Sequence, residues 1–264
     1  MKKTILLTND DGVFSKGLQL VYNSLCSEYD VTIVAPHKEQ SGVGHSFTYN
    51  NPLFFNKIEN GFSDKMFSVT GSPADCVKFA ISQIMPFFPD FIVSGMNIGE
   101  NSGVSSYYSG TVAGAREGAF WRIRSFAFSL CSEAEKYAEK YAQFIPQIID
   151  LINNADFIKD LKIFYNINFP PYKPTEISGI KFTRQSMAFF QDKYKPVLTE
   201  LDCQVVNAFE IYGEKEDVEE SDEFDSRALI NKWITITPHT FDSTSYNYYS
   251  SYKSIENKFV LKGD

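Results

Sequence analysis

Short apolar runs alternate with helical patterns over the first half of the chain. The run Thr4 to Thr8 predicts a strand, and the apolar residues spaced three and four apart after Ser15 predict a helix with Ser15 as its N-cap. Further strands are expected at 31–34, 91–94 and 126–129, with helices starting at Ser72 and near Ser109. This order is typical of βαβ units and predicts an α/β, Rossmann-like fold, a mostly parallel sheet with flanking helices.

The pattern changes in the second half of the chain. A long helix is expected at 133–153, kinked or split at Pro146. Later strands alternate in a way that suits hairpins, and the acidic run at 214–225 indicates a solvated loop. We therefore expect a Rossmann-like metal- and phosphate-binding core at 1–160 and a smaller β-rich lobe at 161–264, unless the second part completes the same domain.

Composition narrows the class of protein. The chain has 264 residues, 43% of them hydrophobic, and a formal net charge of −8. That charge argues against binding long nucleic acid, which requires a basic surface, but a small phosphorylated substrate remains compatible because a bound cation reverses the local field. The amino terminus does not resemble a signal peptide, and no apolar stretch is long enough to span a membrane. The scattered cysteines are typical of reduced thiols, so a cytoplasmic protein with no membrane contact is expected. Those cysteines are Cys26, Cys76, Cys131 and Cys203.

Two adjacent carboxylates, Asp10 and Asp11, follow the first strand and precede Gly12. Two ionised carboxylates a few ångströms apart repel each other, so such a pair shares a proton or holds a divalent cation. The alternative is a turn or a helix cap, which Asp-Asp-Gly alone favours. Other residues have to decide between these interpretations.

Polar loops follow two other strands of the predicted sheet, at 40–46 and 94–99. The carboxyl ends of parallel strands meet at one edge of an open sheet, and ligands bind there. Ser41 and Asn97 would therefore lie at the same edge as Asp10 and Asp11. Two carboxylates, a hydroxyl and an amide oxygen form a partial shell for Mg²⁺ or Mn²⁺. Each residue taken singly is more often a turn or loop residue, so their shared position carries the metal prediction.

The segment Ser109-Gly110-Thr111 begins a predicted helix. Free backbone N–H groups and hydroxyls at a helix N-terminus bind anions, although an ordinary N-cap is the commoner use of such a segment. We place Asn9, Ser109, Gly110 and Thr111 in a candidate phosphate site. His45 is a candidate general acid or base, and a structural role for it is equally compatible with the sequence.

The ordered motifs of this chain resemble the SurE survival-protein family of metal-dependent 5′/3′-nucleotidases. The matching blocks cover nearly the whole chain: Ile5-Leu6-Leu7-Thr8-Asn9-Asp10-Asp11-Gly12, Val34-Ala35-Pro36, Gln40-Ser41-Gly42-Val43-Gly44-His45-Ser46, Gly71-Ser72-Pro73-Ala74-Asp75-Cys76-Val77, Ser94-Gly95-Met96-Asn97-Ile98-Gly99, Tyr108-Ser109-Gly110-Thr111-Val112, Asn166-Ile167-Asn168-Phe169-Pro170, Lys181-Phe182-Thr183-Arg184-Gln185 and Ile236-Thr237-Pro238.

The resemblance implies a site and an activity. It implies one divalent metal ion per subunit, Mn²⁺ or Mg²⁺, held by Asp10, Asp11, Ser41 and Asn97, the set that the strand-end argument also selects. It implies hydrolysis of nucleoside 5′- and 3′-monophosphates, in some members also of short polyphosphate. Asp10 and Asp11 would then be catalytic as well as metal-binding. A homodimer or dimer of dimers, built partly by exchange of carboxy-terminal elements, is also implied.

The chain departs from the family pattern in two places. Val104-Ser105-Ser106 stands where an acidic residue or two usually precedes Tyr-Ser-Gly-Thr, and Arg122 and Arg124 replace a Gly and a Pro. The first departure lies near the predicted phosphate site. It therefore bears on substrate preference more than on the metal.

Two other functions use acidic residues after the first strand of such a sheet. A receiver-like signalling module binds Mg²⁺ there but needs a phosphate-accepting aspartate after its third strand, where this chain offers only Asp64. A sugar-nucleotide-using transferase would retain its donor instead of turning it over to free phosphate. Phosphate release therefore distinguishes a hydrolase from both.

Overall fold

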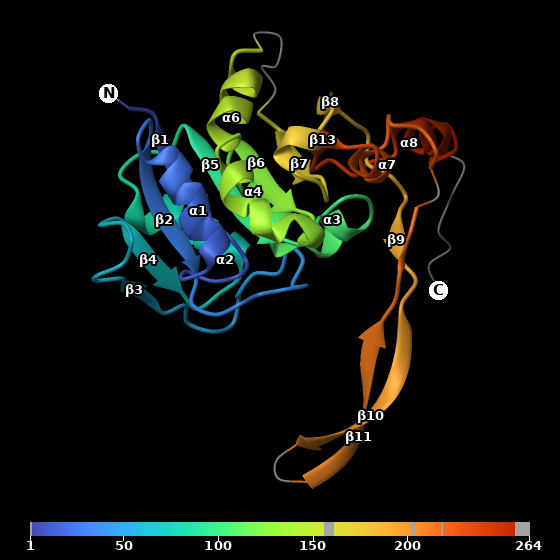
Figure 1. Ribbon diagram of the computed structural model, residues 1–264, viewed down its shortest axis with the longest axis horizontal. Coiled ribbons are helices and arrows are strands. Elements are labelled where there is room, and N and C mark those ends of the chain that lie inside the picture. The colour runs from blue at the N-terminus through green and yellow to red at the C-terminus, as the bar shows by residue number, and fades with distance from the viewer. Residues whose placement is uncertain (1, 156–160, 202–203, 218, 257–264) are drawn as a thin grey trace.

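A nine-stranded sheet forms the centre of the molecule in the computed structural model, which describes residues 2–155, 161–201, 204–217 and 219–256 (Figure 1). The strand order is β3-β4-β2-β1-β5-β6-β7-β13-β8. The six strands from β4 to β7 are mutually parallel. Their bounds are Met66–Val69 for β4, Asp30–Pro36 for β2, Thr4–Thr8 for β1, Phe91–Ile98 for β5, Arg124–Leu130 for β6 and Ile163–Phe169 for β7. The predicted Rossmann-like, mostly parallel sheet is confirmed.

The outer strands on both sides of the sheet add antiparallel pairs to its parallel centre. At one edge β3, Phe55–Lys57, runs antiparallel to β4. At the other, β13, Trp233–Thr240, pairs antiparallel with β7, and β8, Gly179–Phe182, runs parallel to β13. Strands from the second half of the chain thus extend the same sheet, while the division into two domains stays a prediction.

Side chains of β1 alternate between the two faces of the sheet, as the period of a strand requires. Ile5 and Leu7 pack in one cluster, and Leu6 packs in another. All three are fully buried, and each such side chain contributes about 1.5–3 kcal/mol to folding. Helices therefore have to cover both faces.

Three helices cover the face that carries Ile5 and Leu7, and two cover the other. The first set is α1 (Lys16–Leu25), α5 (Ala138–Ala142) and α6 (Ile145–Asn153). The second is α2 (Pro73–Phe79), which packs with Leu6, and α4 (Gly110–Phe120), which packs against α2, β5 and β6. The shorter elements are a π-helix at Ala80–Ile84, α3 at Ser105–Tyr108 and 3₁₀ turns at Ser132–Tyr137 and Pro174–Glu176.

Serine caps set the starts of the helices that lead into the site. The Ser15 side chain accepts from the Leu18 N–H, and Ser72 and Asp75 form a reciprocal capping box. These caps were expected from the sequence and are confirmed. Pro146 lies in the first turn of α6, so the expected long helix at 133–153 is split before it.

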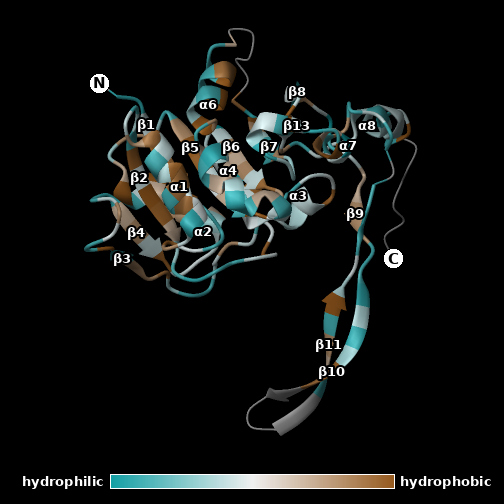
Figure 2. Ribbon diagram, in the orientation of Figure 1, coloured by the Kyte–Doolittle hydropathy of each residue, from teal (hydrophilic) through white to brown (hydrophobic). Residues whose placement is uncertain are grey.

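A hairpin projects from the carboxy-terminal half, well away from the sheet (Figure 1). It consists of β10, Lys193–Leu201, and β11, Gln204–Tyr212, and a short pair lies at its base, β9 (Phe189–Phe190) with β12 (Lys215–Glu216). The chain then forms α7, Asp225–Ile230, and, after β13, α8, Tyr246–Lys253. In Figure 2 the hairpin carries hydrophobic stretches far from the core. Within the described ranges, no helix is long and apolar enough to cross a membrane.

The expectation of a solvated loop at 214–225 is wrong near both ends, because Lys215–Glu216 form β12 and Asp225 begins α7. Asp225 is fully buried, and its carboxylate accepts hydrogen bonds from the backbone N–H groups of Gly103, Ser186 and Ser226 at 2.9–3.0 Å. Because a buried carboxylate needs such partners, Asp225 joins the carboxy-terminal segment to the loop before α3.

Candidate active site at the carboxyl edge of the sheet

The loops that carry the predicted site residues leave neighbouring strands β2, β1 and β5. Asp10 and Asp11 follow β1, and Ser41 lies in the loop after β2. Asn97 is the second-to-last residue of β5. The Gln40 N–H donates to the Asp10 carbonyl oxygen at 2.7 Å, which joins the first two loops. The carboxyl edge therefore gathers the four predicted metal ligands on three adjacent strand ends, as the topology requires.

Asp10 is held by the N-terminus of α4. Its side chain is 5% exposed and accepts hydrogen bonds from the Thr111 N–H at 3.0 Å and the Thr111 hydroxyl at 2.5 Å. Gly110 permits this approach, because a Cβ there would lie 2.8 Å from the Asp10 Cβ. Burial raises the pKa of Asp10, although the bonds from Thr111 act in the opposite direction. The sequence indicated both elements but not their direct contact.

Asp11 has no partner of this kind: within the described residues, its carboxylate makes no hydrogen bond or ion pair. Burial raises its pKa to about 6, and the charges of Asp10 and Glu39 add to this effect. Glu39 also accepts from the Ser41 hydroxyl at 2.6 Å. Sequence reasoning missed Glu39, which had no pattern to distinguish it from a solvated loop residue. Three acidic side chains thus influence one another at this edge.

The donor set suits a hard divalent cation. The Asn97 Nδ2 donates a hydrogen bond to the Gly99 carbonyl at 2.6 Å. Because the amide nitrogen is used in this way, the amide oxygen is the atom of Asn97 that can bind a metal ion. Two carboxylates with raised pKa values, a hydroxyl and an amide oxygen match the preference of Mg²⁺ and Mn²⁺ for oxygen. Across the part of the chain that the structure describes, no cluster of three His, Cys, Asp or Glu side chains forms a metal site. A site here would complete its shell with water and substrate.

The predicted phosphate-binding residues have protein partners. The Ser109 hydroxyl accepts from the Val112 N–H at 3.1 Å and caps α4. Both donors of Thr111 bond to Asp10, so Thr111 positions a carboxylate in this structure. The Asn9 Nδ2 donates to the Gly12 carbonyl at 3.1 Å and to Ser15 at 2.7 Å, while its Oδ1 is buried without a partner. Their role in binding phosphate, with that of Gly110, stays a prediction.

His45 lies against the carboxy-terminal end of α4. Its Nε2 is 2.9 Å from Glu117 Oε2, and its ring stacks on Phe120 with centroids 5.1 Å apart. The Glu117 side chain is only 4% exposed, and it also accepts from the Trp121 indole at 2.9 Å and pairs with Lys78 at 3.4 Å. Burial raises the pKa of Glu117, but these partners outweigh it and the net shift is downward. No pattern in the sequence indicated that Glu117 is buried, and the acid/base role of His45 stays a prediction.

A cavity of about 450 Å³ opens beside the Asp10 loop. Gln40, whose N–H bonds to Asp10, lines it together with Lys38, Phe47 and Asp75. A volume in this range accommodates a small organic ligand such as a nucleotide. Asp75 belongs to the capping box of α2 and also accepts from the Thr48 N–H and hydroxyl, so its carboxylate has a structural role in this fold.

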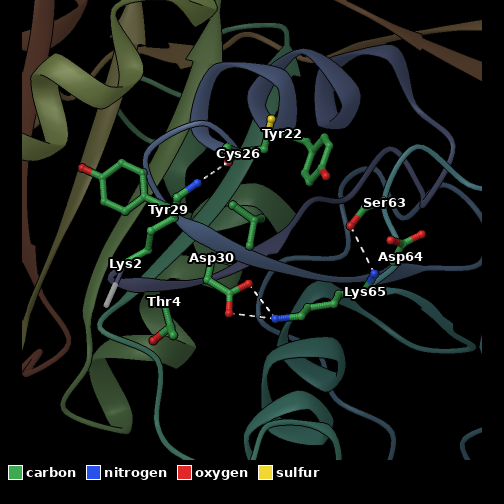
Figure 3. A pocket seen from close by; sticks show the side chains of 10 residues that line it. Lys2, Thr4, Tyr22, Cys26, Tyr29, Asp30, Ser63, Asp64 and Lys65 are labelled. Atoms are coloured by element: carbon green, nitrogen blue, oxygen red, sulfur yellow. Dashed lines mark hydrogen bonds and ion pairs between the residues drawn. The ribbon is translucent and has the colours of Figure 1, made fainter.

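A second cavity, of about 530 Å³, lies at the opposite end of the strands, where β1 and β2 begin (Figure 3). Thr4 and Asp30, the first residues of these strands, line it with Lys65. Asp30 and Lys65 pair at 2.6 Å, and both are about half exposed. The Asp30 carboxylate thus has a cationic partner, whereas neither Asp10 nor Asp11 has one among the described residues.

The model of the family described as Survival protein SurE matches residues 5–192. The chain belongs to the SurE family. The recognition made from the sequence motifs is therefore confirmed. The match spans β1 to the base of the hairpin, and it includes every predicted site residue.

SurE relatives match over almost their whole length. The chain is 35% identical to the 5′-nucleotidase SurE of Syntrophobacter fumaroxidans, over 92% of this chain and 95% of that protein. It is 35% identical to the 5′-nucleotidase SurE of Coxiella burnetii, over 93% and 94%. The crystal structure of the SurE protein from Aquifex aeolicus superposes with a TM-score of 0.80 at 33% identity and covers 96% of this chain and 99% of that one. Fold and family thus agree.

The two departures from the SurE motifs have distinct structural settings. Val104 and Ser105 line an apolar cavity of about 720 Å³ with Phe189 and Phe190 at the hairpin base. Arg122 has φ +61°, in the left-handed region that favours glycine, and lies in the turn after α4. The first segment thus lies at the base of the hairpin, and Arg122 lies in the turn that ends α4.

Proposed function

We propose that the protein is a divalent-metal-dependent phosphomonoesterase that hydrolyses nucleoside 5′-monophosphates to nucleoside and phosphate. The observation that carries this proposal is the adjacent pair of Asp10, which is buried, and Asp11, which is half-buried, at the carboxyl edge. Both have raised pKa values, and no cationic side chain pairs with either among the described residues. Burying like charges together costs free energy that a bound cation offsets. The name 5′-nucleotidase, carried by relatives at 35% identity over nearly the whole chain, supports the same activity.

Asp10, Asp11, Ser41 and Asn97 would hold one Mn²⁺ or Mg²⁺. When bound, such an ion supplies positive charge for a phosphate oxygen and lowers the pKa of a coordinated water. The residues of the chain prepare that position. Thr111 fixes the orientation of Asp10 through two hydrogen bonds, and Asp11 adds negative charge that a cation would neutralise.

The remaining site residues would act on the substrate. Ser109, Gly110, Asn9 and Thr111 lie beside Asp10 or in its loop and would contact phosphate oxygens, with Gly110 allowing close approach of the backbone. His45, in the loop at 40–46, is the candidate acid or base. Its ring is held in place by Glu117. Asp10 or Asp11 would contact the attacking water.

Three finer properties belong to the same proposal. We include 3′-monophosphates and short polyphosphate among the substrates, and a cytoplasmic location. We also propose a homodimer, or a dimer of dimers, because the projecting hairpin exposes large apolar side chains that a second copy would cover. These are Tyr194, Leu198, Phe209, Ile211 and Tyr212.

The experiment is a phosphate-release assay on nucleoside 5′- and 3′-monophosphates with Mn²⁺, Mg²⁺ and Zn²⁺ added separately. Release that requires a divalent cation and is lost on chelation supports the proposal. Full-rate release by Asp10→Asn would contradict the site. A cation-dependent protein that keeps its nucleotide and releases no phosphate would instead be a transferase or a receiver-like module.

A further inference from the structure

A polar cavity of about 460 Å³ lies on the α4 side of the sheet and contains none of the predicted site residues. Residues of α3, α4, β7 and β13 line it, and the segment after β13 closes it. Its lining includes the guanidinium of Arg116 on α4 and the imidazole of His239 on β13. Phe164 of β7 pairs with His239 in the sheet.

Arg116 has no acidic partner. Within the described residues, its only hydrogen bond is to the Ser106 carbonyl at 3.3 Å, and no carboxylate lies within ion-pair distance. Its guanidinium lies 5.5 Å from the centroid of the Phe164 ring. Burial lowers the pKa of Arg116, which records the cost of removing this cation from water. Since a guanidinium has five donors, most of its hydrogen-bonding capacity is unused.

His239 presents a second unused polar group. Its Nε2 is buried without a hydrogen-bond partner, and its ring stacks on Phe164 with centroids 5.2 Å apart. Burial lowers its pKa to about 4, with Asp225 acting in the opposite direction and Arg116 adding to the lowering. At neutral pH the ring is therefore uncharged, and one of its nitrogens carries a proton that it can donate.

The acidic side chain that lines the cavity already has partners. Asp242 lines the cavity, but its carboxylate accepts from the Thr244 N–H at 2.9 Å and from the Tyr246 hydroxyl. It makes no ion pair with Arg116. The cavity thus combines an unpaired cation, a neutral imidazole and the Gln185 side chain, with space for a small molecule.

We propose that this cavity binds a small oxyanion, a carboxylate or a phosphate, with Arg116 as its principal ligand and His239 as a second donor. The planar guanidinium fork matches two oxygens of either group. Arg116 belongs to the helix whose N-terminus holds Asp10, and it bonds to α3 just before that N-terminus. The occupied cavity would therefore stabilise the helix pair behind the active site.

The test is isothermal titration of the metal-free full-length protein with inorganic phosphate and, separately, with succinate, at constant ionic strength. The variants are Arg116→Met and Arg116→Lys, with Lys140→Met as a control that removes the same charge from an exposed position on α5. We expect wild type and the control to bind at least one probe, and Arg116→Met to bind it at least about tenfold more weakly. Arg116→Lys should bind with intermediate affinity.

The two probes distinguish the sources of the anion, because binding of only one identifies its class. His239→Gln, which removes the ring but leaves the cation, provides a second variant if Arg116→Met does not fold by circular dichroism; it should weaken binding by a smaller factor. Equal affinity of wild type and the Arg116 variants would overturn the proposal, as would the absence of binding of either probe to wild type.

Discussion

The two ends of the strands in the central sheet show two ways of placing a carboxylate. The amino edge is the end where β1 and β2 begin, and the carboxyl edge is the end where they finish. At the amino edge, Asp30 faces Lys65 at 2.6 Å and both side chains are about half exposed. At the carboxyl edge, Asp10 is 5% exposed, and Asp10 and Asp11 have each other and Glu39 as charged neighbours. The Asp30 carboxylate has a cationic partner and water, whereas two adjacent carboxylates, one of them buried, are stabilised by a shared proton or by a bound cation. This difference separates a surface ion pair from a candidate metal site.

The largest effect is expected from Asp10→Asn. The substitution keeps the shape of the side chain but removes a proposed ligand charge, so phosphate release should fall at least about 100-fold, since even residues that only support metal ligands cost about 10–100-fold. Steady-state assays with a nucleoside monophosphate and Mn²⁺ measure it. Asp30→Asn is the matched control at the other edge, and equal losses in both variants would contradict the comparison.

Thr111→Val should have the next largest effect. Valine keeps the branched shape and the backbone N–H but removes the hydroxyl that donates to Asp10, so activity and metal affinity should fall about 10–100-fold. Thr111→Ser restores a hydroxyl and should recover most of the activity. If valine is as active as threonine, Asp10 is not positioned through this bond.

Glu117→Gln tests a buried carboxylate that has partners. Its lowered pKa means that the folded state favours the charged form, so its stabilising contribution is full above the unfolded pKa near 4.3 and is lost as pH falls through the lower folded value. Losing charged hydrogen bonds from His45 and Lys78 should cost roughly 1.5–3 kcal/mol at pH 7. Urea unfolding at pH 7 and pH 3 should show this difference shrinking with acid; a constant difference would exclude the ion pairs as its cause.

The smallest effect is expected from Asp30→Asn itself. Exposed ion pairs contribute about 0–1 kcal/mol, so its free energy of unfolding should change by no more than about 1 kcal/mol at moderate salt. Nucleotidase activity should equal that of wild type. A loss of activity would give the amino-edge cavity of Figure 3 a functional role that its paired charges do not indicate.

Local and topological rules account for what the sequence predicted. Ser15, Ser72 and Pro146 are short-range signals, because a cap or a missing N–H acts within one helical turn. The common edge of Asp10, Ser41 and the β5 loop followed from parallel pairing alone. These features required no knowledge of which helix lies beside which strand.

The contacts that the sequence did not reveal are long-range. Glu117 resembles a solvated helix position until the loop at 45 brings a histidine to it, 72 residues away in the chain. Asp225 ends an acidic run, yet it is buried because it receives the N–H of Gly103, 122 residues away. Thr111 reaches Asp10 only after α4 packs on the sheet. Tertiary packing decides such contacts, so periodicity does not encode them.

The most direct test of the site is Mn²⁺ binding measured by isothermal titration calorimetry in wild type, Asp11→Asn and Asp30→Asn. If the carboxyl-edge residues hold the metal, wild type and Asp30→Asn should each bind one Mn²⁺ per chain, and Asp11→Asn should lose a large part of this affinity. Equal Mn²⁺ affinity in wild type and Asp11→Asn would contradict a metal site at this pair of carboxylates.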